Sequence, residues 1–127
     1  MREQQCDYVL KTASERGVRM VRLWFTDVLG NLKSFAISQN ELENALNDGM
    51  TFDGSSIDGF SRVQESDVLA IPDPDTFQIL PFGDKDAAEA RVFCDIHHLD
   101  GSAFTGDPRQ VLRRHVEAAR GEGLTFY

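Results

Sequence analysis

Cysteine is scarce in this sequence, which argues against a fold that disulfides hold together. The two cysteines, Cys6 and Cys94, lie far apart, and neither belongs to a C-x-x-C motif. Small secreted domains that rely on disulfides carry many more cysteines than this. We therefore expect reduced cysteines and an intracellular protein.

Basic residues are also in short supply. Lysine and arginine total 13 against 21 aspartates and glutamates, which gives a formal net charge of −8. Because nucleic acid and anionic membranes are bound through Lys and Arg, we expect neither as a partner. Such acidity would suit a cation, whether a metal, ammonium or an amine, but net charge also serves solubility alone.

Long apolar runs are missing as well. None approaches the roughly 18 apolar residues that suggest a membrane span, and the polar residues 1–5 do not begin a secretory signal. The remaining composition, 41% hydrophobic and 27% charged, is that of a globular domain large enough to bury a core. We expect a cytoplasmic protein.

Hydrophobic periodicity predicts an α+β fold, a small mixed sheet with flanking helices. The predicted helices cover residues 4–16, a short segment from about 39 to 48, and a last helix that begins after Asp107. The predicted strands cover residues 19–25, 32–37, 68–71, 76–80 and 90–96, and a further strand begins at 124–127. The first two strands form a hairpin, and S-x-x-E at 38–41 is typical of a capping box.

The last helix has a strong start signal, with Asp at the N-cap position and Pro and Gln in the first turn. The apolar face of this helix contains Val111, Leu112, Val116 and Ala119. The arginines that we expect to face solvent, or to meet an acidic neighbour, are Arg109, Arg113 and Arg114. On the first strand, Trp24 and Arg22 alternate with Val21 and Leu23, so an exposed Trp24 face would be a candidate interface.

One loop, residues 51–67, concentrates polar chemistry: T-F-D-G-S-S-I-D-G-F-S-R-V-Q-E-S-D. Gly, Ser and Asp favour turns, whereas the apolar residues spaced among them suggest that the loop is held against a scaffold. Ordered polar loops on a scaffold are where binding chemistry concentrates. Asp53 could offer a carboxylate to a cation there, and a purely structural turn is the alternative.

Two nucleotide-binding or catalytic motifs are approached and missed in this loop. G-S-S-I-D-G-F-S at 54–61 resembles a phosphate loop, but Phe60 stands where Lys is required. The same stretch misses the nucleophile elbow because Asp58 occupies the second Gly position. We therefore expect neither motif to operate.

No metal site is expected elsewhere in the sequence. D-P-D at 73–75 lacks the further ligands of a calcium loop. In C-D-I-H-H at 94–98, strand alternation places Cys94 and Asp95 on opposite faces, where they cannot share an ion. His115, within the last helix, is expected to be solvated or half-buried.

The loop and its flanks contain a set of recognisable stretches: F-D-G-S-S-I-x-G-F at 52–60, E-S-D at 65–67, P-D-P at 72–74, V-R-L-W-F-T-D-V-L-G-N-L-K at 21–33, C-D-I at 94–96 and D-P-R-x-V-L-R-R at 107–114. Together they resemble the N-terminal domain of type I glutamine synthetase, and most closely its actinobacterial branch. The resemblance implies a β-grasp domain at 1–103, and the first helix of a missing catalytic domain at 104–127.

The resemblance also implies roles for four loop residues. Asp53 would bind ammonium and help to deprotonate it, and Ser56 would support the same loop. Phe60 matches an aromatic residue near the nucleotide. Arg62 matches a position that is tied to feedback regulation by glutamine in one branch.

The implied enzyme uses ATP, Mg²⁺ or Mn²⁺, glutamate and ammonium, and forms a double hexameric ring in which one subunit's N-terminal domain closes its neighbour's site. The family's metal ligands lie in the catalytic domain, so we expect these 127 residues alone to bind no cofactor and to have no synthetase activity. Two alternatives stay open: a ligase for a larger amine such as a polyamine, and a stand-alone assembly module without chemistry.

Overall fold

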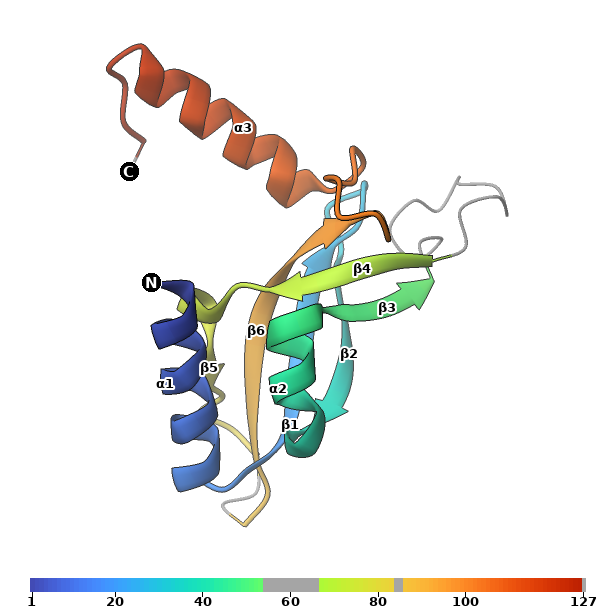
Figure 1. The fold of residues 1–127 in the computed structure, drawn as a ribbon, viewed down its shortest axis with the longest axis vertical. Coiled ribbons are helices and arrows are strands. Elements are labelled where there is room, and N and C mark those ends of the chain that lie inside the picture. Colours follow the sequence, from blue (N-terminus) through green and yellow to red (C-terminus); the bar gives the residue numbers. More distant parts are fainter. Residues whose placement is uncertain (54–66, 84–85, 127) are drawn as a thin grey trace.

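The computed structural model describes residues 1–53, 67–83 and 86–126 of the chain. Within these ranges the elements follow in this order (Figure 1): α1 (Arg2–Glu15), β1 (Val18–Thr26), β2 (Leu32–Ser38), α2 (Gln39–Asp48), β3 (Met50–Asp53), β4 (Asp67–Pro72), the 3₁₀ turn η2 (Pro74–Thr76), β5 (Gln78–Ile79), β6 (Ala88–His97) and α3 (Pro108–Gly121). Within these ranges no helix combines the length and apolar character that crossing a bilayer requires.

The strands form one mixed sheet in the order β2-β1-β6-β4-β3, and β5 pairs with β6 as well. β1 runs parallel to β6, whereas β1–β2, β3–β4, β4–β6 and β5–β6 are antiparallel. This mixed sheet with helices beside it confirms the predicted α+β class. The predicted hairpin is confirmed as β1–β2.

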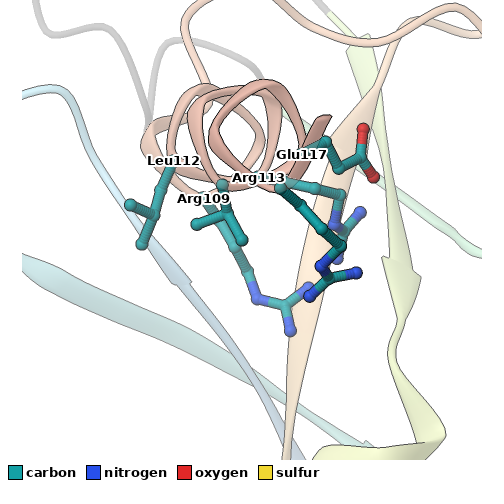
Figure 2. A pocket seen from close by; sticks show the side chains of 6 residues that line it. Arg109, Leu112, Arg113 and Glu117 are labelled. Carbon is teal, nitrogen blue, oxygen red and sulfur yellow. The ribbon is translucent and has the colours of Figure 1, made fainter. Parts of the chain in front are cut away.

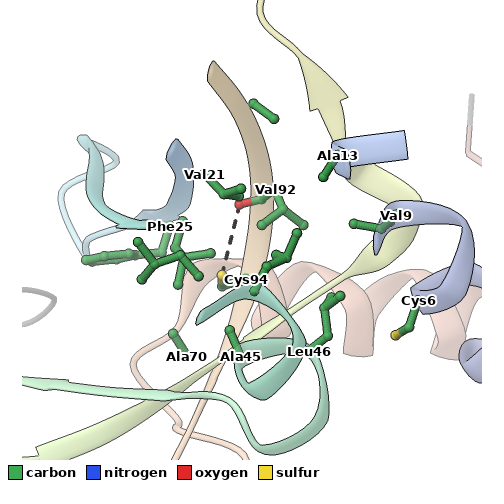
Figure 3. Close-up of a cluster of buried hydrophobic side chains, with 14 of the residues drawn as sticks. Cys6, Val9, Ala13, Val21, Phe25, Ala45, Leu46, Ala70, Val92 and Cys94 are labelled. Atoms are coloured by element: carbon green, nitrogen blue, oxygen red, sulfur yellow. Dashed lines mark hydrogen bonds between the residues drawn. The ribbon is translucent and has the colours of Figure 1, made fainter. Parts of the chain in front are cut away.

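The core lies between the sheet and the helices α1 and α2. Alternate residues of β1 and β6 point into it, as the period of two requires. The fully buried side chains of this core include Val9, Leu23, Leu42, Leu46, Val92 and Ile96. Figure 3 shows both helices contributing to the cluster, with the thiol of Cys94 directed at the carbonyl oxygen of Val92.

Two glycines set the ends of the first two helices. Gly17 follows α1 with φ of 67°, and Gly49 follows α2 with φ of 76°, a region that residues with a Cβ seldom occupy. At Gly49 a Cβ would also lie 2.9 Å from the Cγ atom of Leu69. The chain can therefore turn directly from α2 into β3 only because no side chain is present.

Several boundary predictions were wrong. Ser38 is the N-cap of α2, but its side chain makes no capping hydrogen bond, so the capping box does not form. The strand expected at 76–80 is only the two-residue β5, because the 3₁₀ turn that follows Asp73 uses Thr76. Residues 51–53 are strand, not loop, and residues 124–126 are irregular, not a strand.

Candidate functional site

The strand pair β3–β4 positions Asp53. Phe52 packs among aromatic rings, with centroids 4.8 Å from Phe25 and 5.5 Å from Phe35. Because side chains alternate along a strand, this anchor leaves Asp53 on the other, exposed face of β3. The predicted carboxylate therefore stands at the end of an anchored strand.

A second carboxylate lies directly across from Asp53. The antiparallel register pairs Asp53 with Asp67, and both residues are exposed. Residues directly opposite in an antiparallel pair share a face, and like charges in that arrangement repel each other. The base of the 54–66 segment thus carries two negative charges on one face, an arrangement that a cation would stabilise.

A different polar cluster joins α3 to the sheet. Arg109 contacts two aspartates: its Nη2 lies 2.7 Å from Asp73 Oδ2, and its Nη1 lies 2.5 Å from Asp95 Oδ1. Arg113 Nη1 lies 2.8 Å from the other oxygen of Asp95. Figure 2 shows both arginines extending from the same side of α3 toward the strands. We call these four residues the arginine clamp.

The clamp is partly shielded from water. The side chains of Arg109 and Asp95 are 26% and 13% exposed. Burial alone would lower the pKa of Arg109, but its hydrogen bond to Asp73 and the charge of Asp95 raise the pKa overall. The guanidinium is therefore always charged in this setting, and its contacts are charge-assisted bonds, which are stronger than neutral ones.

Asp107 completes the junction at the start of α3. It is fully buried, and its carboxylate accepts hydrogen bonds from the backbone N–H groups of Arg109, at 3.1 Å, and Ile96, at 2.9 Å. Burial raises the pKa of Asp107, and the two N–H bonds oppose that rise. The side-chain amide of Gln110 donates to the carbonyl oxygen of Ile96. The first turn of α3 is thus tied to β6 by polar bonds.

The prediction that the arginines of α3 face solvent was wrong for two of them. Arg109 and Arg113 meet acidic side chains of this chain and hold the helix to the sheet. Leu112 of the apolar face is 64% exposed. Arg114 is exposed, as predicted. The apolar side of α3 instead borders an open hollow that reaches Val28 on the β1–β2 turn. Sequence analysis did not find the clamp; the i, i+4 spacing of Arg109 and Arg113 was the available signal.

Trp24 is half-buried, and its face of the sheet is partly covered. Its ring meets Phe93 edge-on at 5.6 Å, and the guanidinium of Arg91 lies 5.6 Å from the Trp24 centroid. Arg91 is held there by bonds to the carbonyl oxygen of Thr76 and to Gln78. The face is therefore an aromatic and cationic cluster, not a bare apolar patch.

In the part of the chain that the structure describes, no three His, Cys, Asp or Glu side chains come together as a metal site. Cys94 is buried in the core, and burial raises the pKa of its thiol far above the usual value. Asp73 accepts a hydrogen bond from the backbone N–H of Asp75, and so belongs to a turn. His115 is exposed, with Nδ1 2.9 Å from the carbonyl oxygen of Val111.

Comparison with known proteins identifies the fold and the family. The family model described as "Glutamine synthetase, beta-Grasp domain" matches residues 17–106. The chain belongs to this glutamine synthetase domain family. The predicted β-grasp fold and the predicted family are both confirmed.

Curated relatives support the same assignment. Glutamine synthetases of Mycolicibacterium smegmatis and Mycobacterium tuberculosis are each 54% identical over 127 residues, covering 98% of this chain and 28% of the relative. The enzyme of Methanosarcina mazei is 45% identical over 118 residues, covering 93% of this chain and 26% of the relative. The mycobacterial matches confirm the resemblance to the actinobacterial branch. The chain thus spans little more than a quarter of the length of these glutamine synthetases.

Solved structures show the same fold. A cryo-EM structure of Plasmodium falciparum glutamine synthetase superposes with a TM-score of 0.80 at 24% identity, covering 97% of this chain and 23% of that one. A complex of GmaS with ADP superposes with a TM-score of 0.79 at 25% identity, covering 90% of this chain and 26% of that one. The domain architecture is therefore shared even where sequences have diverged widely.

The other residues predicted from the glutamine synthetase resemblance fall in one segment. Ser56, Phe60 and Arg62 lie outside the described residues, so their predicted roles stay predictions. Of the predicted site, the structure positions Asp53 and the strands on either side of the segment.

Proposed function

We propose that this chain is the N-terminal part of a longer glutamine synthetase, which joins ammonia to glutamate at the expense of ATP through γ-glutamyl phosphate. The family match and the mycobacterial relatives support this proposal. The chain spans 28% of the length of those relatives, so the rest of the enzyme would supply most of the active site.

We further propose that residues 1–103 form the β-grasp domain and that residues 104–127 begin the catalytic domain. The position of α3 supports this division, since the helix stands apart from the core that α1 and α2 cover (Figure 1). Leu112 of α3 is 64% exposed, and Leu124, which follows the helix, is 60% exposed. Exposed apolar side chains such as these gain free energy from burial against another body.

The observation that carries the function is the placement of Asp53. Anchored by Phe52 and facing Asp67, the carboxylate stands on the exposed face at the start of the F-D-G-S-S-I segment. In the proposed role it attracts ammonium, accepts hydrogen bonds from it and takes up its proton. The product is neutral ammonia, the nucleophile that attacks the activated γ-carboxyl carbon.

ATP and Mg²⁺ or Mn²⁺ would be held by the rest of the enzyme. The described residues of this chain do not assemble a metal site. In the proposed enzyme, chains associate in a cytoplasmic double hexameric ring, and the Asp53 segment of one chain closes the site of its neighbour. Ser56 would support that segment, Phe60 would lie near the nucleotide, and Arg62 would take part in feedback regulation.

The test is Asp53→Ala in the longer enzyme, measured as KM for ammonium and KM for ATP. A charged hydrogen bond contributes about 1.5–3 kcal/mol, so we expect KM for ammonium to rise about 10- to 100-fold. KM for ATP should change little, because Asp53 is assigned no contact with the nucleotide.

The matched control is Asp75→Ala, which removes an exposed carboxylate on the η2 turn. We expect both KM values of this variant to match those of the wild-type enzyme. Equal loss of ammonium and ATP affinity in Asp53→Ala would show that the loop is only structural. A wild-type enzyme that uses polyamines in preference to ammonium would replace the proposed substrate with a larger amine.

A further inference from the structure

The arginine clamp connects α3 to β6 and to the residue that follows β4. Arg109 reaches Asp73, just after β4, and Asp95 in β6, while Arg113 adds a second bond to Asp95. Asp73 is itself fixed to β6, because its backbone N–H donates to the carbonyl oxygen of Phe93 at 2.8 Å. One guanidinium thus joins three elements.

β4 connects the clamp to the candidate site. Its first residue, Asp67, lies opposite Asp53, and its last residue, Pro72, precedes the clamp residue Asp73. β4 is hydrogen-bonded along both sides, to β3 and to β6. A strand held in this way moves as part of the sheet, so the angle of α3 to β4 also fixes the angle of α3 to the Asp53 strand pair.

Little apolar packing assists the clamp in holding α3. Gln110 is the buried residue among the described residues of the helix, and its amide is bonded to Ile96. Leu112, which lines the same hollow as Arg109 and Arg113 (Figure 2), is 64% exposed. The orientation of α3 therefore depends on directional polar bonds. Arg109 makes two of them, one to Asp73 after β4 and one to Asp95 in β6.

We propose that Arg109 is a positioning residue, which fixes α3 to the sheet and thereby sets where the Asp53 strand pair stands relative to the body of the longer enzyme. This inference rests on the proposed function, in which Asp53 meets ammonium at a site that the rest of the enzyme completes. Arg109 touches no substrate in this scheme and acts through the geometry of the α3 junction.

The test compares Arg109→Gln with Arg114→Gln in the longer enzyme. Both changes remove one positive charge from α3, but Arg114 is exposed, and within the described residues it makes none of the ion pairs of the clamp. Two quantities are measured: the ratio of KM for ammonium to KM for ATP, and hydrogen–deuterium exchange of the amides of residues 108–121.

For Arg109→Gln we expect the ratio of KM values to rise about 2- to 30-fold, the usual range for coupling between distant sites. Exchange in α3 should become faster than in Arg114→Gln. Asp73→Asn removes the charge from one of the two Arg109 contacts and should change both quantities in the same direction by less. It also replaces Arg109→Gln if that variant does not assemble.

The double variant Arg109→Gln/Asp73→Asn should be no worse than Arg109→Gln alone, because both changes remove the same ion pair. A KM ratio in Arg109→Gln equal to that in Arg114→Gln would overturn the positioning role, even if exchange in α3 became faster. If the wild-type enzyme did not use ammonium, the proposed function would fail. The exchange data would then still decide whether Arg109 fixes α3.

Discussion

Replacing Asp107 with Ala tests whether the α3 junction depends on one buried carboxylate. Asp107 Oδ2 accepts the N–H of Ile96, and Oδ1 accepts the N–H of Arg109 at the first turn of the helix. Loss of an N-cap side chain typically costs about 1 kcal/mol. The N–H of Ile96, a residue with 0% exposure, would also lose its partner, which costs about 1–3 kcal/mol.

One effect offsets part of this loss. Burial raises the pKa of Asp107 because the folded state disfavours its charged form, and Ala removes that cost. We therefore expect Asp107→Ala to lower the free energy of unfolding by about 2–3 kcal/mol at pH 7. Urea unfolding of the 127-residue chain, followed by circular dichroism, measures this difference.

The matched control is Asp100→Ala. Asp100 also accepts two hydrogen bonds, from the N–H and the hydroxyl of Ser102 at 2.8 and 2.6 Å, but in an exposed turn. Water can replace these bonds, so we expect a clearly smaller loss than for Asp107→Ala. Equal losses in the two variants would refute the argument that burial of the Ile96 N–H makes Asp107 important.

The pH dependence gives a second check. Because the folded-state pKa of Asp107 lies above its unfolded value of about 3.9, the proton-linked part of its contribution is fully present below that value and is lost as pH rises through the folded pKa. The stability difference between wild type and Asp107→Ala should therefore be larger at pH 3 than at pH 7. A difference that shrank on acidification would contradict the raised pKa.

Two further predictions concern the helix end and the hairpin turn. Gly49→Ala should lower the free energy of unfolding in urea by about 2–4 kcal/mol, because φ of 76° with ψ of 176° is a glycine conformation and the new Cβ would meet Leu69. The control is Gly17→Ala, which has open space around it and should lower the free energy of unfolding by only about 1 kcal/mol. For Asp27, burial acts to raise the pKa, but hydrogen bonds from Asn31 and others lower it overall, so its contribution is present above the unfolded pKa and lost as pH falls. The stability gap between wild type and Asp27→Asn should therefore narrow from pH 7 to pH 3, and a gap that widened would show that the bonds do not outweigh burial.

The sheet was predictable because its signals are local. Val21, Leu23 and Phe25 alternate with half-buried residues, and each is buried as the period of two requires. The ends of α1 and α2 also follow from glycines that the sequence displays. Asp53 was identified by resemblance, and what the structure adds is the Phe52 anchor and the facing Asp67, which depend on strand register.

The orientation of α3 was not predictable from its own sequence. Amphipathic periodicity shows that a helix has two different faces, but not which body each face meets. Arg109 finds Asp95 and Asp73 at separations of 14 and 36 residues, and both partners lie in segments whose own patterns predict only a strand and a turn. Long-range pairing of this kind requires knowledge of the sheet order.

The contacts of α3 are consistent with a helix that joins the sheet to a second part of the longer enzyme. Its polar side is already satisfied by the sheet through Arg109, Arg113 and Asp107, and directional bonds of this kind define an angle well. Leu112, on the side of α3 that Arg109 and Arg113 share, is 64% exposed and can still gain burial energy from contact with another body. In the proposed enzyme the sheet would therefore determine how α3 is oriented, and the catalytic body would supply most of the energy that stabilises it.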